Sequence, residues 1–486
     1  MTKNSFKLGG VEVTHLTHDS RTARAGSCFF ALPGTKTDGA VYVMQAVANG
    51  ASIIVAQRGS KVPDVPVPVL FVDDVRETMS LASKRFYNDI CDKMNIIGVT
   101  GTNGKTTCTY ILRGLCGRPR TPSRHIVGVI GTLGAFIGDD CISKSLTTPE
   151  RNGQTHIGHL TTPDPIELHE IFYTMYKRGV RTVIMEVSAH AIHYKKVAGI
   201  NFRAGIFTNL TQDHLDFFNT MDEYAKTKAN FMTGAQVQTA VINIDDPYGQ
   251  DIYLNCESAE SYSINDAIDL EMSQGHNSFN IGKHRLDMNL AGRFNVMNAL
   301  ACIKVARILG ITFRKIKKRL ATVEPVSGRF NVYKSKKGFS IIIDYAHTPD
   351  GIEKILTSAR ELVSEKGKLI AVFGCGGNRD KTKREIMGKL AGNLADFAVV
   401  TSDNPRDESP EAIMLQIEAG VKATDNKNYK LLEDRMEAIY FAFDMASEGD
   451  VVVIAGKGAE TTQEIAGIFH PYSDIETVKD YISKGN

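Results

Sequence analysis

The sequence predicts an α/β protein of three domains, in which a central parallel-sheet domain with a phosphate-binding loop lies between a smaller N-terminal α/β domain and a C-terminal Rossmann-like domain. Three observations predict this fold. The chain has 486 residues, which is too long for one ordinary core. Short apolar runs typical of strands alternate with helical stretches. One of these runs ends in a glycine-rich turn followed by lysine and two threonines.

The N-terminal domain is expected over residues 1–94, where β-like runs at 52–55 and 69–72 alternate with helical stretches. The central domain is expected over 95–326, and its parallel strands are predicted by four apolar runs: 96–99, 182–185, 204–207 and 240–244. The C-terminal domain is expected over 327–486, where the alternation restarts with runs at 339–343, 369–373, 397–400 and 451–454.

Composition narrows the class of partner. Lys and Arg total 57 against 55 Asp and Glu, and no polybasic tract supports a nucleic-acid or membrane partner. The 8 cysteines show no paired or metal-type spacing, which indicates free thiols in a reducing compartment. The N-terminus lacks an apolar signal core, and no apolar run approaches the length of a membrane span. We therefore expect a soluble cytoplasmic monomer that acts on small molecules.

The most informative segment has the sequence IIGVTGTNGKTT. Gly101 and Gly104 allow backbone N–H groups to close around phosphate oxygens, and Lys105 brings positive charge to the β- and γ-phosphates of a nucleotide. Thr106 can offer its hydroxyl to Mg²⁺. The general P-loop pattern has glycine where this chain has Val99, so the loop is an irregular one. The residues expected to bind nucleotide here are Gly101, Thr102, Asn103, Gly104, Lys105, Thr106 and Thr107.

Polar residues also follow two central strands, where open parallel sheets place their ligands. Glu186 comes directly after the run 182–185, and it is a candidate Mg²⁺ ligand. The run 204–207 leads into a segment rich in oxygen and imidazole groups, in which His214 is placed to reach a second metal or its surroundings. The alternative for neighbours such as Thr211 is that they only cap the next helix.

Several motifs carry a family resemblance. Four of them are similar to motifs of the Mur ligase family of ATP-dependent amide-bond-forming enzymes, whose core folylpolyglutamate synthetases share: GTNGKTT at 101–107, MEVS at 185–188, the segment 208–216 and GRFNVMN at 292–298. Others resemble the branch of that family that adds the third residue of the peptidoglycan stem peptide: DSR at 19–21, GTKTDG at 34–39, TTP at 161–163, DYAHTP at 344–349, GCGGNRDK at 374–381, DNPR at 403–406 and GKG at 456–458.

The resemblance implies that a substrate carboxylate attacks the γ-phosphate of ATP and that an amine then attacks the acyl phosphate. Lys105 would steady the phosphoryl group, while Thr106 and Glu186 would hold Mg²⁺. A second Mg²⁺ would be bound by His214 and by a carbamylated lysine that matches Lys228. Lys226 is the nearby rival. It lies two residues earlier, so on a helix it points roughly 200° away.

The resemblance also assigns the nucleotide contacts outside the loop. Asn295 matches an adenine-contacting position, Arg329 lies at the hinge into the third domain, and Asp344 would accept a hydrogen bond from the ribose. The alternatives are that Asn295 is an N-cap and that Asp344 opens the turn that follows it.

A UDP-N-acetylmuramoyl-dipeptide is expected between the first two domains. The matching residues are Ser20, Thr35, Lys36, Thr37, Thr161, Thr162, Ser188 and Lys196. Lys196 stands where relatives carry arginine, which gives up bidentate binding. The chain has two TTP triplets, at 147–149 and 161–163, and the second keeps the family spacing to Ser188. Residues 117–160 are then interpreted as an extended loop.

DNPR at 403–406 resembles the version of this motif in enzymes that add meso-diaminopimelate, which implies that the third domain selects this amino acid rather than L-lysine. Arg406 can bind the second carboxylate of diaminopimelate, which lysine lacks, while Asn404 bonds the adjacent amino group. The full set of expected contacts is Arg379, Asp403, Asn404, Arg406, Gly456 and Glu460. Ala459 replaces the family's usual histidine, and Arg379 has the alternative of an ion pair with a neighbouring carboxylate. Three other functions stay open, namely the same ligase with L-lysine, a folylpolyglutamate synthetase, and a nucleotide-driven binding protein without ligase chemistry.

Overall fold

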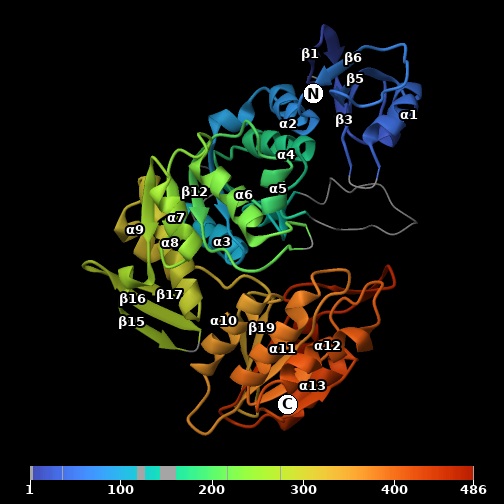
Figure 1. Ribbon diagram of the computed structural model, residues 1–486. Helices are drawn as coiled ribbons and strands as arrows, with labels where there is room; N and C mark the ends of the chain where they lie inside the picture. The colour runs from blue at the N-terminus through green and yellow to red at the C-terminus, as the bar shows by residue number, and fades with distance from the viewer. Residues whose placement is uncertain are drawn as a thin grey trace.

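The structure is a computed structural model that describes residues 4–34, 37–117, 126–142, 160–215, 217–273 and 275–484. Three lobes follow one another along the chain, and they appear as the blue, green and orange parts of Figure 1. Each lobe is built on a sheet with helices packed against it. In the described part of the chain, no helix is both long enough and apolar enough to cross a membrane.

The first lobe contains a parallel sheet of order β3-β4-β5-β6 and the hairpin β1-β2. The strands are β1 (Phe6–Leu8), β2 (Val11–Val13), β3 (His15–Thr17), β4 (Ser27–Ala31), β5 (Ala51–Gln57) and β6 (Val69–Val72). The helices are α1 (Val43–Ala48) and α2 (Val75–Phe86). Asp74 caps α2 by accepting hydrogen bonds from the backbone N–H groups of Arg76 and Glu77, which fixes where this helix begins.

The central lobe contains an eight-stranded sheet of order β10-β9-β8-β11-β7-β12-β13-β14. Its strands are β7 (Asn95–Thr100), β8 (Val127–Gly131), β9 (Gly134–Ile137), β10 (Asp140–Cys141), β11 (Thr182–Glu186), β12 (Phe202–Phe207), β13 (Ala240–Asn243) and β14 (Ala259–Tyr262). Its helices are α3 (Lys105–Cys116), α4 (Pro165–Lys177), α5 (Ala189–His193), α6 (Met221–Thr233), α7 (Pro247–Leu254), α8 (Arg293–Ile308) and α9 (Phe313–Leu320). Strand β7 pairs in parallel with β11 and β12, so its C-terminal end lies near the middle of one sheet edge.

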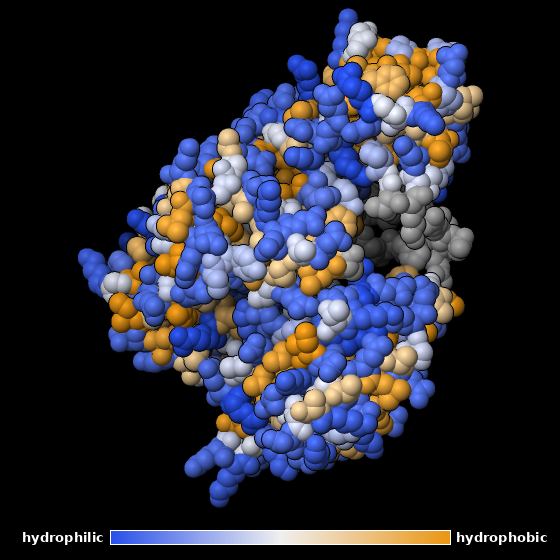
Figure 2. All heavy atoms as spheres, viewed as in Figure 1, coloured by the Kyte–Doolittle hydropathy of each residue, from blue (hydrophilic) through white to orange (hydrophobic). Residues whose placement is uncertain are grey.

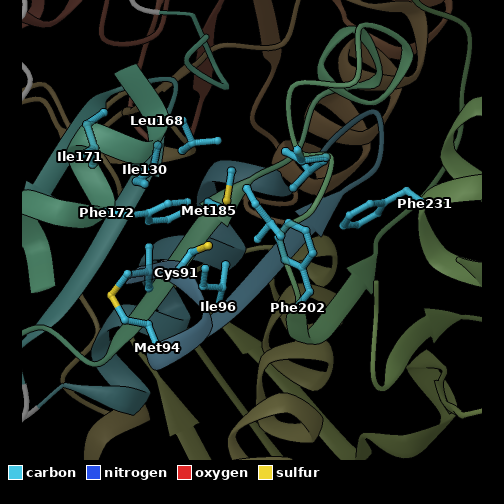
Figure 3. Close-up of a cluster of buried hydrophobic side chains, with 14 of the residues drawn as sticks. Cys91, Met94, Ile96, Ile130, Leu168, Ile171, Phe172, Met185, Phe202 and Phe231 are labelled. Atoms are coloured by element: carbon cyan, nitrogen blue, oxygen red, sulfur yellow. The ribbon is translucent and has the colours of Figure 1, made fainter. Parts of the chain in front are cut away.

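Both faces of this sheet are buried. Successive residues of a strand point to opposite faces, so they belong to different apolar clusters. Ile96 of β7 packs in one apolar cluster with Met185 and Phe202 of the neighbouring strands, and Figure 3 shows Phe172 of α4 in the same cluster. Ile97, the next residue, belongs to a second cluster that includes side chains of α3 and α8. The near-continuous apolar runs of the sequence are therefore strands covered on both sides.

Two parts of the central lobe differ from the prediction. Residues 117–160 were interpreted as an extended loop, but within the described residues 126–142 the chain forms β8, β9 and β10, and the β8-β9-β10 edge is antiparallel. The sequence also gave no signal for an antiparallel sheet of β15 (Ile268–Ser273), β16 (His276–Ile281) and β17 (His284–Met288), which projects from this lobe in Figure 1. Glycines interrupt β8 and β9, and polar residues interrupt β15, β16 and β17, so neither segment shows a long apolar run.

The third lobe has a sheet of order β18-β19-β23-β20-β21-β22, parallel except at the β18 edge. Its strands are β18 (Asn331–Lys334), β19 (Ser340–Asp344), β20 (Leu369–Phe373), β21 (Phe397–Val400), β22 (Tyr429–Leu431) and β23 (Val451–Ala455), with a hairpin of β24 (Thr462–Ile465) and β25 (Ile468–Pro471). Its helices are α10 (Pro349–Arg360), α11 (Thr382–Leu394), α12 (Pro410–Lys422), α13 (Arg435–Met445) and α14 (Asp474–Ser483). The face of the molecule shown in Figure 2 is largely hydrophilic, with apolar residues in small groups.

A buried ion pair ties the last helix to this sheet. The side chains of Arg435 and Asp474 are both 0% exposed, and Arg435 Nε lies 2.8 Å from Asp474 Oδ1. Arg435 also donates through Nη2 to the carbonyl oxygen of Ala455, at the end of β23, at 2.9 Å. Removing one partner of such a pair leaves a buried charge without compensation.

Arg435→Met should therefore lower the free energy of unfolding of the third lobe by about 3–5 kcal/mol. The matched control is Arg360→Met, which breaks the ion pair with Asp396, where the two side chains are 41% and 42% exposed. That change should cost less than about 1 kcal/mol. Urea unfolding followed by circular dichroism measures both, and equal losses for the two variants would contradict the assignment.

Candidate active site

The glycine-rich turn lies between β7 and α3, at the C-terminal edge of the central sheet. Gly101 has a φ of 140° and Gly104 has a φ of 88°, a backbone conformation that residues with a side chain rarely adopt. A Cβ at Gly104 would also lie 2.5 Å from Asn298 Oδ1 of α8. Both glycines are therefore required by the path of the turn, which directs the first N–H groups of α3 outward as a cradle for an anion.

Two lysine amines meet at this turn, one from half-buried Lys105 and one from buried Lys228. Lys105 donates through Nζ to the carbonyl oxygens of Gly101 at 2.9 Å and Thr102 at 2.8 Å. Lys228 of α6 donates through Nζ to the same Gly101 oxygen at 2.9 Å. Burial lowers the pKa of Lys105, and burial together with the charge of Lys105 lowers the pKa of Lys228 well below its ordinary value, although Asp213 opposes both changes. Lys228 is thereby favoured as a neutral, nucleophilic amine.

The rival position on α6 lies in a different environment. Lys228 is 1% exposed, whereas Lys226 is exposed to solvent. The ammonium atom of Lys228 lies 4.9 Å from the ring centre of Tyr224, whose hydroxyl contacts the Thr102 hydroxyl at 3.1 Å. Helical geometry thus turns Lys228 and Tyr224 towards the turn and turns Lys226 away from it.

Glu186 lies at the end of β11, adjacent to β7. Its Oε1 accepts a hydrogen bond from the backbone N–H of Thr132 at 3.0 Å, and its Oε2 accepts one from the Thr132 hydroxyl at 3.1 Å. The Thr132 hydroxyl also contacts the Thr161 hydroxyl at 3.1 Å. Thr132 follows strand β8, much as Glu186 ends β11. It was not predicted as a site residue because β8 itself was not predicted.

The second TTP triplet lies directly beside this carboxylate. The Thr162 hydroxyl donates to the backbone carbonyl of Glu186 at 2.9 Å and to Ser188 Oγ at 3.3 Å. The backbone N–H of Ser188 donates back to the Thr162 hydroxyl at 3.1 Å. Thr161, Thr162 and Ser188 are therefore brought together, whereas the first triplet, at 147–149, lies outside the described residues.

His214 takes a strained backbone conformation with a φ of 56°. Burial lowers its pKa to about 4, against the opposing effect of Asp213, so the imidazole is neutral near pH 7 and able to bind a metal. Asp213 holds the ring through an Oδ2 to Nε2 distance of 3.4 Å. In the described chain, no three His, Cys, Asp or Glu side chains form a metal site by themselves. Mg²⁺ commonly completes its coordination with phosphate oxygens and water, so Thr106, Glu186 and His214 fit this mode of binding.

A cavity of about 510 Å³ opens beside the turn, between the central and third lobes. Its walls include Asn103, Gly104, Asn298, Arg329 and Asp344. Asn295, to which the sequence analysis assigned the adenine contact, is buried behind this wall. Its side-chain amide donates to the carbonyl of Ala291 at 2.7 Å, and its Oδ1 accepts from Asn298 Nδ2 at 3.2 Å. Asn298, one helical turn further along α8, lines the cavity instead.

Arg329 and Asp344 lie on the third-lobe side of the cavity. Arg329 donates through Nη2 to the Thr106 hydroxyl at 3.3 Å and lies 4.4 Å from the ring centre of Tyr345. Asp344 accepts backbone hydrogen bonds from Phe330 and Ala346, both at 2.7 Å, so it does open the turn that follows it. Burial raises the pKa of Asp344, while Arg329 and these two N–H groups oppose the rise.

The first-lobe residues are less closely grouped. Ser20 is buried and donates to Gln45 Oε1 at 2.7 Å, and Thr37 is exposed. Thr35 and Lys36 lie outside the described residues. Lys196 forms an ion pair with Asp164, with Nζ 2.7 Å from Oδ1. Lys196 thus already has a carboxylate partner.

The third-lobe residues that are expected to bind the amino-acid substrate, called here the amino-acid group, cluster after β21 and β23. Arg406, with a φ of 53°, donates through Nε to Glu464 Oε2 at 2.9 Å and through Nη1 to the carbonyl of Gly377 at 2.7 Å. Burial alone would raise the pKa of Asp403, but Lys457 and Arg435 outweigh it and lower that pKa.

Two further residues complete this group. Gly456 is required because a Cβ there would lie 2.5 Å from Asp403 Oδ2. Arg379 is exposed, and no ion pair joins it to Asp380 or Glu385 in the described structure. Its guanidinium is therefore not committed to the neighbouring carboxylates that the sequence analysis considered as partners.

The chain belongs to the Mur ligase family. Three family models match it in succession: the Mur ligase family catalytic domain over residues 12–87, the Mur ligase middle domain over 99–306, and the Mur ligase glutamate ligase domain over 328–458. The predicted family and three-domain fold are thereby confirmed.

Among its relatives are UDP-N-acetylmuramoyl-L-alanyl-D-glutamate–2,6-diaminopimelate ligases. The protein of that name from Caldanaerobacter subterraneus subsp. tengcongensis is 40% identical over 98% of this chain and 95% of its own length. The one from Geobacillus thermodenitrificans is 40% identical over 94% of this chain and 92% of its own. A solved structure of an enzyme with this name superposes with a TM-score of 0.66 at 29% identity, covering 97% of this chain and 95% of the other. A Mycobacterium tuberculosis folylpolyglutamate synthase, at 16% identity and a TM-score of 0.59 over 78% of this chain and 92% of its own, shares the fold.

Asn298→Ala should weaken the binding of ATP by about tenfold or more, because it removes a polar side chain from the cavity wall. Asn295→Ala, one turn away on α8, should mainly lower the melting temperature, because that amide bonds inside the protein. Isothermal titration with ATP and thermal unfolding measure the two effects. A larger loss of ATP affinity in Asn295→Ala than in Asn298→Ala would restore the original assignment.

Proposed function

We propose that this protein is an ATP-dependent ligase that joins meso-2,6-diaminopimelate to UDP-N-acetylmuramoyl-L-alanyl-D-glutamate in peptidoglycan biosynthesis. The observation that carries the proposal is the meeting of Lys105 and Lys228 at the Gly101 carbonyl. It places one amine that can contact phosphate and one that can form a carbamate at the same glycine-rich turn. The names and full-length similarity of the relatives support the choice of substrates.

ATP is proposed to occupy the cavity between the central and third lobes. Its phosphates would lie on the turn from Gly101 to Thr107, its base against Asn298, and its ribose near Asp344. Arg329 would reach the phosphates, since it already contacts the Thr106 hydroxyl. Mg²⁺, held by Thr106 and Glu186, would neutralise phosphate charge, and a second ion would be held by His214 and carbamylated Lys228.

The proposed chemistry proceeds in two bond-forming steps. The side-chain carboxylate of the D-glutamyl residue attacks the γ-phosphorus of ATP, which forms an acyl phosphate and releases ADP. The amine of diaminopimelate then attacks the acyl carbon, and the tetrahedral intermediate collapses to an amide with loss of inorganic phosphate. Lys105 leaves its two carbonyl partners and stabilises the phosphoryl oxygens during transfer. Thr161, Thr162 and Ser188 lie beside Glu186, where they can orient the UDP-linked substrate next to the phosphates.

Arg406 is proposed to select the amino acid. Its guanidinium can bind the distal carboxylate of meso-diaminopimelate, a group absent from L-lysine. Glu464 and the Gly377 carbonyl already hold it at the ends of the third-lobe strands, so little side-chain freedom is lost on binding. Arg379, exposed on the neighbouring loop, is a further cation for the same substrate.

We also infer domain boundaries near residues 94 and 326, a monomeric state and a cytoplasmic location. The boundaries are supported by the gaps between the three family matches, which fall at 88–98 and 307–327. The free cysteines support a reducing compartment, because none of the eight forms a disulfide in the described structure.

The proposal is tested by phosphate release from ATP in the presence of the UDP-linked dipeptide and either meso-diaminopimelate or L-lysine. We expect release to require both the dipeptide and an amino acid, with a strong preference for meso-diaminopimelate. Arg406→Ala should lower kcat/KM for meso-diaminopimelate by the factor that corresponds to a loss of about 2–5 kcal/mol of transition-state stabilisation. The KM for ATP should change little. Phosphate release from ATP alone would contradict the ligase function, and equal rates with the two amino acids would contradict the specificity.

A further inference from the structure

Lys457 is a buried cation at the centre of the amino-acid group. It follows Gly456 at the end of β23, and its side chain is 0% exposed. Its Nζ donates to Asn404 Oδ1 at 3.0 Å and to Glu460 Oε2 at 2.8 Å. A buried ammonium is costly unless it is paired, so these contacts define the position of both partners as well as that of the lysine.

The contacts around Asn404 determine which way its amide faces. Lys457 Nζ and the backbone N–H of Glu464 both approach Oδ1, each at 3.0 Å, and both groups can only donate. The end of the amide that they meet must therefore be the oxygen. The nitrogen then faces Glu460, and Nδ2 donates to Glu460 Oε2 at 2.9 Å.

This arrangement leaves specific groups available to a ligand. Both lone-pair directions of Asn404 Oδ1 are used, so Asn404 can offer only the second N–H of its amide. Glu460 Oε2 accepts two hydrogen bonds, and no described residue bonds Oε1. A substrate ammonium is thus directed to Glu460 Oε1, and a substrate carboxylate to Asn404 Nδ2. The expectation that Asn404 accepts from the amino group is reversed by this geometry.

The same network reaches Arg406 through Glu464. The backbone N–H of Glu464 holds Asn404, and its side chain accepts from Arg406 Nε at 2.9 Å. The backbone N–H of Arg406 donates to the Glu464 carbonyl at 3.1 Å, and that of Ala466 donates to the Arg406 carbonyl at 2.8 Å. The hairpin strand β24 therefore fixes the guanidinium and the amide relative to each other.

We propose that Lys457 is a positioning residue that sets the orientation of Asn404 and Glu460, so that the site accepts amino acids carrying an ammonium and a carboxylate together at the distal end. Lys457 itself does not reach the substrate, because its side chain is closed off from solvent. The inference rests on the proposed function, since it concerns the amino-acid site of that reaction.

The test compares Lys457→Met, which keeps the length of the side chain and removes the ammonium, with the unmodified enzyme. We expect the KM for meso-diaminopimelate to rise by about tenfold or more, while the KM values for ATP and for the UDP-linked dipeptide change by less than about twofold. The control is Lys422→Met, which removes an exposed lysine paired with Glu418 in the same lobe. It should leave all three KM values unchanged.

A second variant tests the amide orientation and serves if Lys457→Met unfolds. Asn404→Asp keeps an oxygen for Lys457 but removes the N–H donor, so we expect the KM for meso-diaminopimelate to rise here as well. If Asn404 accepted from the ammonium instead, aspartate would bind it at least as well, and an unchanged or lower KM would overturn the inference. An unchanged KM in folded Lys457→Met would also overturn it. Turnover of meso-diaminopimelate by the unmodified enzyme in the same assay tests the proposed function separately.

Discussion

The amines of Lys105 and Lys228 share one carbonyl oxygen at the edge of the central sheet, and the arrangement of the rest of the site depends on that contact. Lys105 and Lys228 both donate to Gly101, and no ion pair is formed by either amine within the described residues. Burial lowers the pKa of both amines, and the charge of Lys105 lowers the pKa of Lys228 further. The turn therefore brings two amines to one carbonyl oxygen at the N-terminus of α3, where backbone N–H groups favour an anion.

The fold creates this contact by bringing four segments to one sheet edge. Gly101 and Lys105 follow strand β7, and Glu186 ends the adjacent strand β11. His214 lies in the loop after β12, and Lys228 lies on α6. The third lobe closes the other side, where the Asn103 amide donates to Asp350 Oδ2 at 2.6 Å. The third lobe thus forms one wall of the cavity.

Much of this arrangement could be predicted from the sequence, because apolar runs of four or five residues identify strands buried on both faces. The predicted run 369–373 coincides with β20, and 96–99 lies within β7. The family resemblance pointed to Lys228, and helical periodicity predicted only that Lys226 and Lys228 lie on different faces of α6. The remaining features depend on tertiary packing. The β8–β10 segment, which contains polar residues and glycine, has no long apolar run. Nothing in GRFNVMN shows which of its two asparagines faces the cavity. The donor-only groups around Asn404 come from segments more than 50 residues away, which no local pattern reveals.

The most direct measurement is ¹³C NMR of the enzyme equilibrated with ¹³C-bicarbonate near neutral pH. A neutral Lys228 amine attacks CO₂, loses a proton to solvent and becomes a carbamate anion. We expect one carbamate resonance that is present in the active enzyme, retained in Lys226→Ala, and lost together with ligase activity in Lys228→Ala. A fully active enzyme without that resonance, or an active Lys228→Ala variant, would contradict the role of the two amines.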